Sequence, residues 1–293
     1  MFVKRARGRP ADFLLRKTVD LAARYLRVAS SRAGKNPYAS PSRRGDELRL
    51  GLLTAPAAIS STLKRFATSE PSELSHVIAV ADRAVSGRFT VLSNTTSADP
   101  ETWDCDFVSG ARWPVRFHSL YAYSDLLDLG RPSDVKVPWE LARLQALPVM
   151  ALAFVITGDE RYARACSARF SSWDRACPVG FGINWTVGME VALRAISLIL
   201  TAEFLAGSTF AREFVTDRLV ESLGEHGRFL YRNIEYSDIN GNHYVSCLIG
   251  LLYLGLALPR HAEAAAWRET AVTGLRREII AESYPDGVCH EGS

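Results

Sequence analysis

Hydrophobic residues recur at helical spacing along most of the chain. Between residues 12 and 28, Leu14, Leu21 and Tyr25 belong to an apolar stripe that faces away from basic positions. Pro71 opens a second predicted helix, which ends before Gly87. Longer helices are then expected over residues 139–157, 160–174, 187–206, 210–231, 244–258 and 262–282.

Alternation with a period of two is nearly absent, so the pattern predicts an all-α fold. Residues 90–116 show no period and are expected to form an ordered functional loop, with a short strand over residues 89–92. Short turns such as Thr157-Gly158-Asp159 separate the long helices, which favours stacked antiparallel hairpins.

Four polar or aromatic signatures mark the predicted hairpins at intervals of about 50 residues. They are Trp139-Glu140-Leu141, Asn184-Trp185, Asn242-His243 and Asp286-Gly287, each at or beside a junction between loop and helix. Repeated hairpins present equivalent junctions on one face. We therefore expect an incomplete (α/α) toroid with Trp139, Asn184, Trp185 and Asn242 around one cleft.

The chain has 293 residues, of which 47% are hydrophobic and 23% charged, with a net charge of +3. Most of the positive excess lies in the first 50 residues, as in Arg24, Arg27 and Arg32. This segment is either the solvated face of a helix or a basic surface that attracts an anionic polymer. The mild overall charge does not indicate a nucleic-acid partner.

No secretion signal or membrane span is expected. Residues 1–16 lack an apolar run of signal-peptide length, and the longest apolar run, residues 244–258, is too short to cross a bilayer. As written, the sequence therefore predicts a cytoplasmic protein. Five cysteines without a CxxC pair indicate mostly reduced thiols, and no cluster of metal ligands or cofactor motif is present.

Asn240-Gly241-Asn242-His243 precedes the apolar helix over residues 244–258. A helix start presents N–H groups and the positive end of the dipole, so an amide and an imidazole there form a plausible cradle for a carboxylate. The alternative is that Asn240 caps the helix and His243 is a surface or core residue.

Tryptophans near the junctions, Trp139 and Trp185 among them, could stack on sugar rings or belong to the core. Two spaced pairs, Glu140 with Arg143 and Glu190 with Arg194, are expected to be structural ion pairs on their helices.

These motifs together resemble the heparinase II/III-type polysaccharide lyases. The similarity is carried by residues 136–143, 157–162, 182–185 and 189–194, and Asn242-His243 and Asp286-Gly287 with Glu291 extend it. It covers residue 81 to the last residue, and residues 1–80 form a separate basic helical segment. The resemblance implies a toroid followed by a β-sandwich, and β-elimination on an acidic, uronic-acid-containing polysaccharide.

By this resemblance, Asn242 neutralises the uronate carboxylate, and His243 is a second neutralising group or the general base. Trp139, Asn184, Trp185, Asn240 and Glu291 are expected to bind the substrate. The family's catalytic tyrosine is expected a few residues after Glu291, and Tyr284 does not match its position.

The chain ends at Ser293, so the resemblance also implies a piece of a longer lyase, without the sandwich, or a truncated product with little activity. Exported relatives imply a periplasmic location. Two other classes stay open, namely a non-catalytic carbohydrate-binding toroid and an α/α-toroid glycoside hydrolase, which needs two carboxylates across a cleft.

Overall fold

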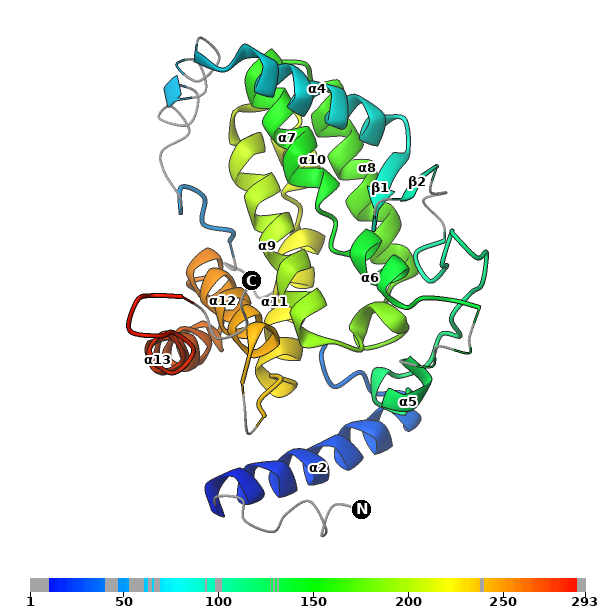
Figure 1. Ribbon diagram of the computed structural model, residues 1–293, viewed down its shortest axis with the longest axis vertical. Helices are drawn as coiled ribbons and strands as arrows, with labels where there is room; N and C mark the ends of the chain where they lie inside the picture. The colour runs from blue at the N-terminus through cyan, green and yellow to red at the C-terminus, as the bar shows by residue number, and fades with distance from the viewer. Residues whose placement is uncertain are drawn as a thin grey trace.

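The computed structural model describes residues 11–39, 47–52, 61–62, 65, 69–92, 94–97, 102–126, 128, 130, 132–237 and 240–288 (Figure 1). Helices dominate these residues. The helices of ten residues or more are α2 (Ala11–Arg32), α4 (Pro71–Val85), α7 (Ala146–Thr157), α8 (Arg161–Ala176), α9 (Gly188–Phe204), α11 (Asp217–Arg232), α12 (Asn242–Ala257) and α13 (Ala264–Ala281). Shorter ones are α5 (Tyr123–Leu126), α6 (Lys136–Ala142), α10 (Ala211–Phe214) and the 3-10 turns η1 (His118–Leu120), η2 (Ile183–Trp185) and η3 (Leu205–Gly207).

An inner row of helices is distinguished by its composition. α7 (ALPVMALAFVIT) is apolar on every side and α12 is nearly so, whereas α8 and α11 carry polar residues on one face. A helix without a polar face must be covered all round. Accordingly, α7 packs against α4, α8 and α9, while α12 packs against α9, α11 and α13.

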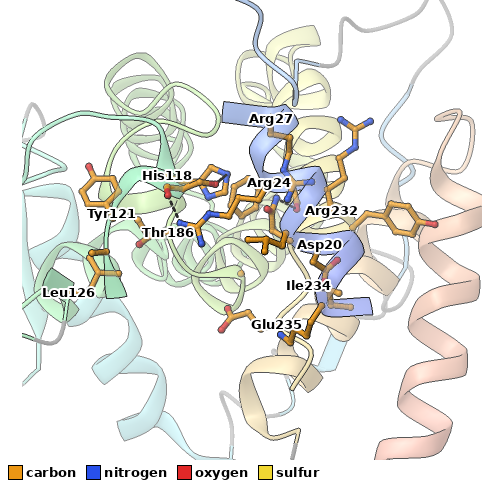
Figure 2. A pocket seen from close by; sticks show the side chains of 18 residues that line it. Asp20, Arg24, Arg27, His118, Tyr121, Leu126, Thr186, Arg232, Ile234 and Glu235 are labelled. Carbon is orange, nitrogen blue, oxygen red and sulfur yellow. Dashed lines mark hydrogen bonds between the residues drawn. The ribbon is translucent and has the colours of Figure 1, made fainter. Parts of the chain in front are cut away.

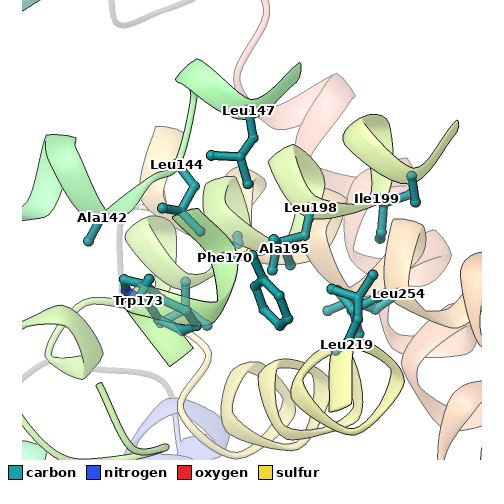
Figure 3. Packing of buried hydrophobic residues seen from close by; sticks show 14 of the residues in the cluster. Ala142, Leu144, Leu147, Phe170, Trp173, Ala195, Leu198, Ile199, Leu219 and Leu254 are labelled. Carbon is teal, nitrogen blue, oxygen red and sulfur yellow. The ribbon is translucent and has the colours of Figure 1, made fainter. Parts of the chain in front are cut away.

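The helices therefore pair in chain order, α7 with α8, α9 with α11 and α12 with α13, around the contiguous row α7, α9 and α12 (Figure 1). This confirms the predicted all-α class and its toroid-like stacking of helix pairs. The core lies between the inner row (α7, α9 and α12) and the helices paired with it (α8, α11 and α13). Figure 3 shows Phe170 and Trp173 from α8, Leu198 from α9 and Leu219 from α11 as members of one buried cluster.

Two predicted helices are broken. The helix expected over residues 139–157 divides into α6 and α7, because Leu144 takes a left-handed conformation (φ 56°). The helix expected over residues 210–231 divides into α10 and α11, since Thr216 caps α11 by accepting a hydrogen bond from the Leu219 amide (3.3 Å).

The aperiodic region also contains more regular structure than expected. β1 (Arg88–Val91) pairs with β2 (Asn94–Ser97) as an antiparallel hairpin that opens the predicted loop of residues 90–116. The predicted short strand is therefore confirmed within one residue, and its partner strand was not foreseen.

By length and composition, one stretch among the described residues could cross a membrane, namely Lys136–Thr157. This corrects the expectation that residues 244–258 come nearest to a span. The apolar character of the stretch has another cause, because the positive φ at Leu144 interrupts it and α7 is packed between three helices.

Gly227 of α11 provides the first test of this packing. A Cβ added there would lie 2.4 Å from Cη2 of Trp267, which is fully buried. We expect Gly227→Ala to lower the free energy of unfolding by about 1–3 kcal/mol, because neither the indole nor the helix backbone can yield. Denaturant unfolding measures this change.

The matched control is Gly207→Ala, since a Cβ at Gly207 meets nothing within 4 Å. Equal stability of the Gly227→Ala variant and the wild type would show that α11 and α13 are not in close contact.

Candidate functional site

Three helix ends meet on one side of the molecule. α9 begins at Gly188, α12 begins at Asn242, and α11 ends at Arg232. A Cβ added at Gly188 would lie 2.8 Å from Cys247 Sγ and 3.1 Å from Glu235 Oε1. The absence of a side chain at position 188 therefore allows α9, α12 and the segment after α11 to touch.

A cavity of about 670 Å³ opens beside these helix ends, and we call it the junction cleft (Figure 2). Its walls come from α2, residues 118–126, residues 186–188 and residues 229–235. The basic N-terminal helix thus forms one wall, since Lys17, Arg24 and Arg27 all line the cleft. Much of α2 is exposed, as expected for the solvated face of a helix, and some of its basic side chains also line a cleft, as expected for a surface that attracts an anion.

Glu235 links the cleft to the candidate catalytic pair. Its Oε1 accepts a hydrogen bond from the Met189 amide (2.9 Å), and its Oε2 lies 2.8 Å from Nδ1 of His243. With the carboxylate ionised, Nδ1 carries the imidazole proton, so the lone pair of the neutral ring is on Nε2. Nothing in the sequence pattern singled out Glu235.

Asn242 and His243 are both exposed on the first turn of α12. Asn240 behaves differently, because its amide donates to Glu278 Oε1 (3.0 Å) and accepts from the Ser237 amide (3.0 Å). The N-cap residue of α12 is Gly241, without a side-chain cap, so the alternative that Asn240 caps this helix is wrong.

Asn184 and Trp185 belong to the core. They are 2% and 1% exposed, and the Trp185 indole donates to the Cys177 carbonyl (3.1 Å). The expectation that these two side chains contact the substrate does not match their burial. Trp139 is half-buried and donates to the carbonyl of Ile183 (3.0 Å) and to Oγ1 of Thr186 (3.2 Å), which lines the cleft.

The burial of Trp185 is explained by Arg194, which is also fully buried. Its guanidinium lies 4.9 Å from the centre of the Trp185 ring and 4.4 Å from that of Trp173. It donates to the carbonyls of Asn184 (3.1 Å) and Ala142 (3.2 Å). One buried cation therefore fixes the Asn184-Trp185 signature and the last residue of α6.

The predicted pair Glu190–Arg194 is consequently wrong. Glu190 instead accepts two hydrogen bonds from Arg143, at 2.6 and 2.9 Å. The predicted pair Glu140–Arg143 is confirmed at 2.6 Å. Glu140 and Glu190, two of the four carboxylates that the hydrolase alternative could use beside Asp104 and Asp106, are thus both bound by Arg143.

Tyr38 and His118 form a second polar pair, which no motif indicated. The Tyr38 hydroxyl lies 2.7 Å from Nε2 of His118, and Asn233 donates to the same hydroxyl (3.1 Å). Burial, reinforced by Arg27 and Arg24, lowers the pKa of His118 to about 3. His118, which lines the cleft, is therefore a neutral imidazole at physiological pH.

Glu291 lies outside the described residues. Asp286 accepts a hydrogen bond from the Val288 amide (3.1 Å) in the turn that contains Gly287. Among the residues that the structure describes, no group of three or more His, Cys, Asp or Glu side chains could hold a metal ion.

Comparison with known proteins supports a family relationship. Residues 74–293 match the family model described as heparinase II/III N-terminus. The heparin-sulfate lyase of Pedobacter heparinus is 31% identical over 164 residues, which are 54% of this chain and 24% of that protein. The heparin-sulfate lyase of Bacteroides stercoris is 27% identical over 175 residues, covering 53% and 26%. The matched regions thus span about a quarter of these relatives.

Two solved structures share the fold of part of this chain. The crystal structure of heparan sulfate lyase HepC from Pedobacter heparinus matches with a TM-score of 0.55 and 23% identity, over 73% of this chain and 30% of that one. The heparinase III BT4657 gene product with methylated lysines matches with a TM-score of 0.53 and 19% identity, over 83% and 42%.

The buried neutral state of His118 predicts an acid-sensitive fold. Its pKa is about 3 in the folded protein and near the ordinary value of 6.5 when unfolded. The unfolded chain therefore binds more protons below pH 6.5, so this stabilisation is present above that pH and is lost as the pH falls toward 3. Between pH 7 and pH 5 the loss should be about 2 kcal/mol.

We expect His118→Gln, which retains a hydrogen-bond acceptor for Tyr38, to reduce the difference in unfolding free energy between pH 7 and pH 5. Urea unfolding at both pH values measures this difference. The surface variant His76→Gln serves as the control, and the same pH difference in all three proteins would contradict a buried neutral His118.

Proposed function

The chain belongs to the heparinase II/III N-terminal family, and from this premise we propose that the protein cleaves a uronic-acid-containing polysaccharide by β-elimination. The observation that carries the proposal is the pairing of His243 with Glu235 (2.8 Å) beside exposed Asn242, at the edge of a cleft lined by arginines.

The uronate carboxylate is the first obstacle to this reaction. Its negative charge resists the further charge that develops when the C5 proton leaves. In this proposal the Asn242 amide, on the first turn of α12, donates to the carboxylate, and the positive end of the α12 dipole acts in the same direction. Both lower the energy of the developing enolate.

Proton transfer is assigned to His243. Its Nδ1 faces Glu235, so Nε2 takes the proton from C5. The C5–H electrons form the C4–C5 double bond, and the bond from C4 to the glycosidic oxygen breaks. That oxygen leaves with a proton from a general acid, a role that the family resemblance assigns to a tyrosine.

The alternatives remain distinguishable. A non-catalytic carbohydrate-binding toroid is also consistent with the basic cleft, because binding an acidic polymer requires no proton transfer. A hydrolase is less well supported. Of its four candidate carboxylates, Glu140 and Glu190 both bind Arg143, and Asp104 and Asp106 lie in one loop. Elimination leaves an unsaturated uronate that absorbs ultraviolet light. Neither hydrolysis nor binding without reaction forms such a product.

We expect Asn242→Ala to lower kcat on heparan sulfate by about 100- to 1,000-fold, because one donor to the developing charge is lost. The rate of appearance of unsaturated product measures this. The experiment uses the natural protein in which this sequence occurs. Ser246→Ala, one turn further along α12, is the matched control and should keep wild-type kinetics and unfolding midpoint. Near-normal turnover of Asn242→Ala would remove Asn242 from the mechanism.

Glu235→Gln tests the positioning of His243 separately. The amide keeps the shape of Glu235 but loses the charge-assisted hydrogen bond that orients the imidazole, so we expect kcat to fall about 10- to 100-fold with KM little changed. An increase in KM at constant kcat would instead assign Glu235 to substrate binding.

A further inference from the structure

A second cavity, of about 380 Å³, lies apart from the junction cleft, and we call it the side pocket. Its walls come from α4, from β1, from Trp103, from the junction between α6 and α7, and from Arg169 of α8. Among the described residues, the side pocket and the junction cleft share no lining residue. The volume of the side pocket lies within the range that small-molecule sites usually have.

The side pocket has mostly apolar walls that belong to the hydrophobic core. Its buried apolar side chains include Ala84, Phe89, Val91, Leu141 and Leu147. Because they are packed against other core residues, these side chains form the walls without a ligand. A ligand gains free energy when contact with such walls removes its apolar surface from water. The side pocket therefore favours a molecule with an apolar body.

Arg169 brings a positive charge to these walls. Its guanidinium lies 4.3 Å from the centre of the Phe89 ring and 5.9 Å from that of Trp103, whose indole donates to Oγ of Ser172 (3.0 Å). Nη1 of Arg169 is buried without a hydrogen-bond partner, and within the described part of the chain Arg169 forms no salt bridge. A buried charge without an acceptor is unfavourable, so the contacts of the protein alone do not account for its position.

Arg169 differs in this respect from Arg194, the buried arginine of α9. Burial lowers the pKa of both side chains. Arg194, however, donates to two backbone carbonyls, and the nearby Glu190 opposes the fall in its pKa. For Arg169, burial is the one cause of the shift, and no acidic group among the described residues opposes it. The charge of Arg169 is therefore uncompensated.

The remaining charged side chains of the side pocket do not supply an anion. Among the described residues that line it, Glu140 is the one carboxylate, and it already pairs with Arg143 (2.6 Å). Arg83 and Arg88 are exposed and add positive charge. The side pocket thus combines apolar walls with positive charge that its own carboxylate does not balance.

Leu144 adds an independent observation. It lines the side pocket, is buried, and has a positive φ of 56° at the break between α6 and α7. A left-handed conformation is unfavourable for a residue with a side chain, and such conformations gather at ligand sites. The strained residue therefore lies where a ligand would be held.

We propose that the side pocket binds a small organic anion with a flat apolar body, namely an aromatic carboxylate, whose carboxylate pairs with Arg169. The planar donors of a guanidinium match the two oxygens of a carboxylate. An inorganic anion fits less well, because apolar walls cannot replace its hydration. A sugar acid fits less well too, because its hydroxyl groups would face apolar side chains. This site does not depend on the lyase proposal.

The test compares three probes by calorimetry. 2-Naphthylacetate carries both features of the proposed ligand, 2-naphthylacetamide has the same shape without the charge, and glucuronate has the charge without the apolar body. We expect the wild type to bind 2-naphthylacetate at least about tenfold more tightly than either of the others, because each lacks one of the two interactions.

Arg169→Met keeps an apolar stem and removes the charge, so it should bind 2-naphthylacetate no more tightly than the amide. The matched control is Arg164→Met on the same helix. The Arg164 guanidinium also lies over an aromatic ring, 4.2 Å from the centre of Phe210, but Arg164 does not line the side pocket. This control should keep the preference of the wild type for the carboxylate.

Two further variants locate the bound probe. Val80→Phe enlarges a half-buried side chain of the α4 wall and should weaken 2-naphthylacetate binding at least about tenfold by filling the side pocket, whether or not Arg169→Met folds. Arg24→Ala removes a cation from the junction cleft and should leave the affinity unchanged.

Several outcomes would overturn the side-pocket proposal. They are no binding of 2-naphthylacetate to the wild type at millimolar concentration, equal affinity for its amide or for glucuronate, and wild-type affinity in both Arg169→Met and Val80→Phe. A loss of affinity in Arg24→Ala alone would place the probe in the junction cleft instead. Each of these results leaves the lyase proposal standing, because that proposal is tested through the unsaturated product.

Discussion

The buried guanidinium of Arg194 is the interaction on which the candidate site depends. Burial lowers its pKa to about 10, so the group stays charged at neutral pH inside the core. Two indole faces and two backbone carbonyls take the place of water around it. Because those carbonyls belong to α6 and η2, this one side chain of α9 holds the loop that leads to Gly188.

Once that loop is fixed, the remaining geometry follows from contacts at the helix ends. Glu235 binds the first turn of α9 through the Met189 amide and the first turn of α12 through His243. The same carboxylate therefore sets the spacing of two inner helices and orients an imidazole. The basic helix α2 contacts η1 and closes the other side of the cleft.

Much of the fold could be predicted from sequence, because apolar runs such as those of α7 and α12 admit few environments other than the interior of a helical stack. The break at Leu144 could not, since a left-handed non-glycine residue has no compositional signal. Glu190 was assigned to the wrong arginine because i,i+4 spacing considers one helix only, whereas Arg143 reaches it from α6. Glu235, His118 and Tyr38 were missed for a related reason, since their partners are distant in sequence or lie outside any motif.

The close contact at Gly188 also has a consequence for the chemistry of sulfur. The side chain that touches this glycine is Cys247, whose pKa burial raises to about 12. Oxidants and alkylating agents react with the thiolate, which this environment suppresses at neutral pH. An adduct on Cys247 would force α9 away from α12 and separate Glu235 from its partners. The packing that builds the site thereby also protects it from oxidative damage.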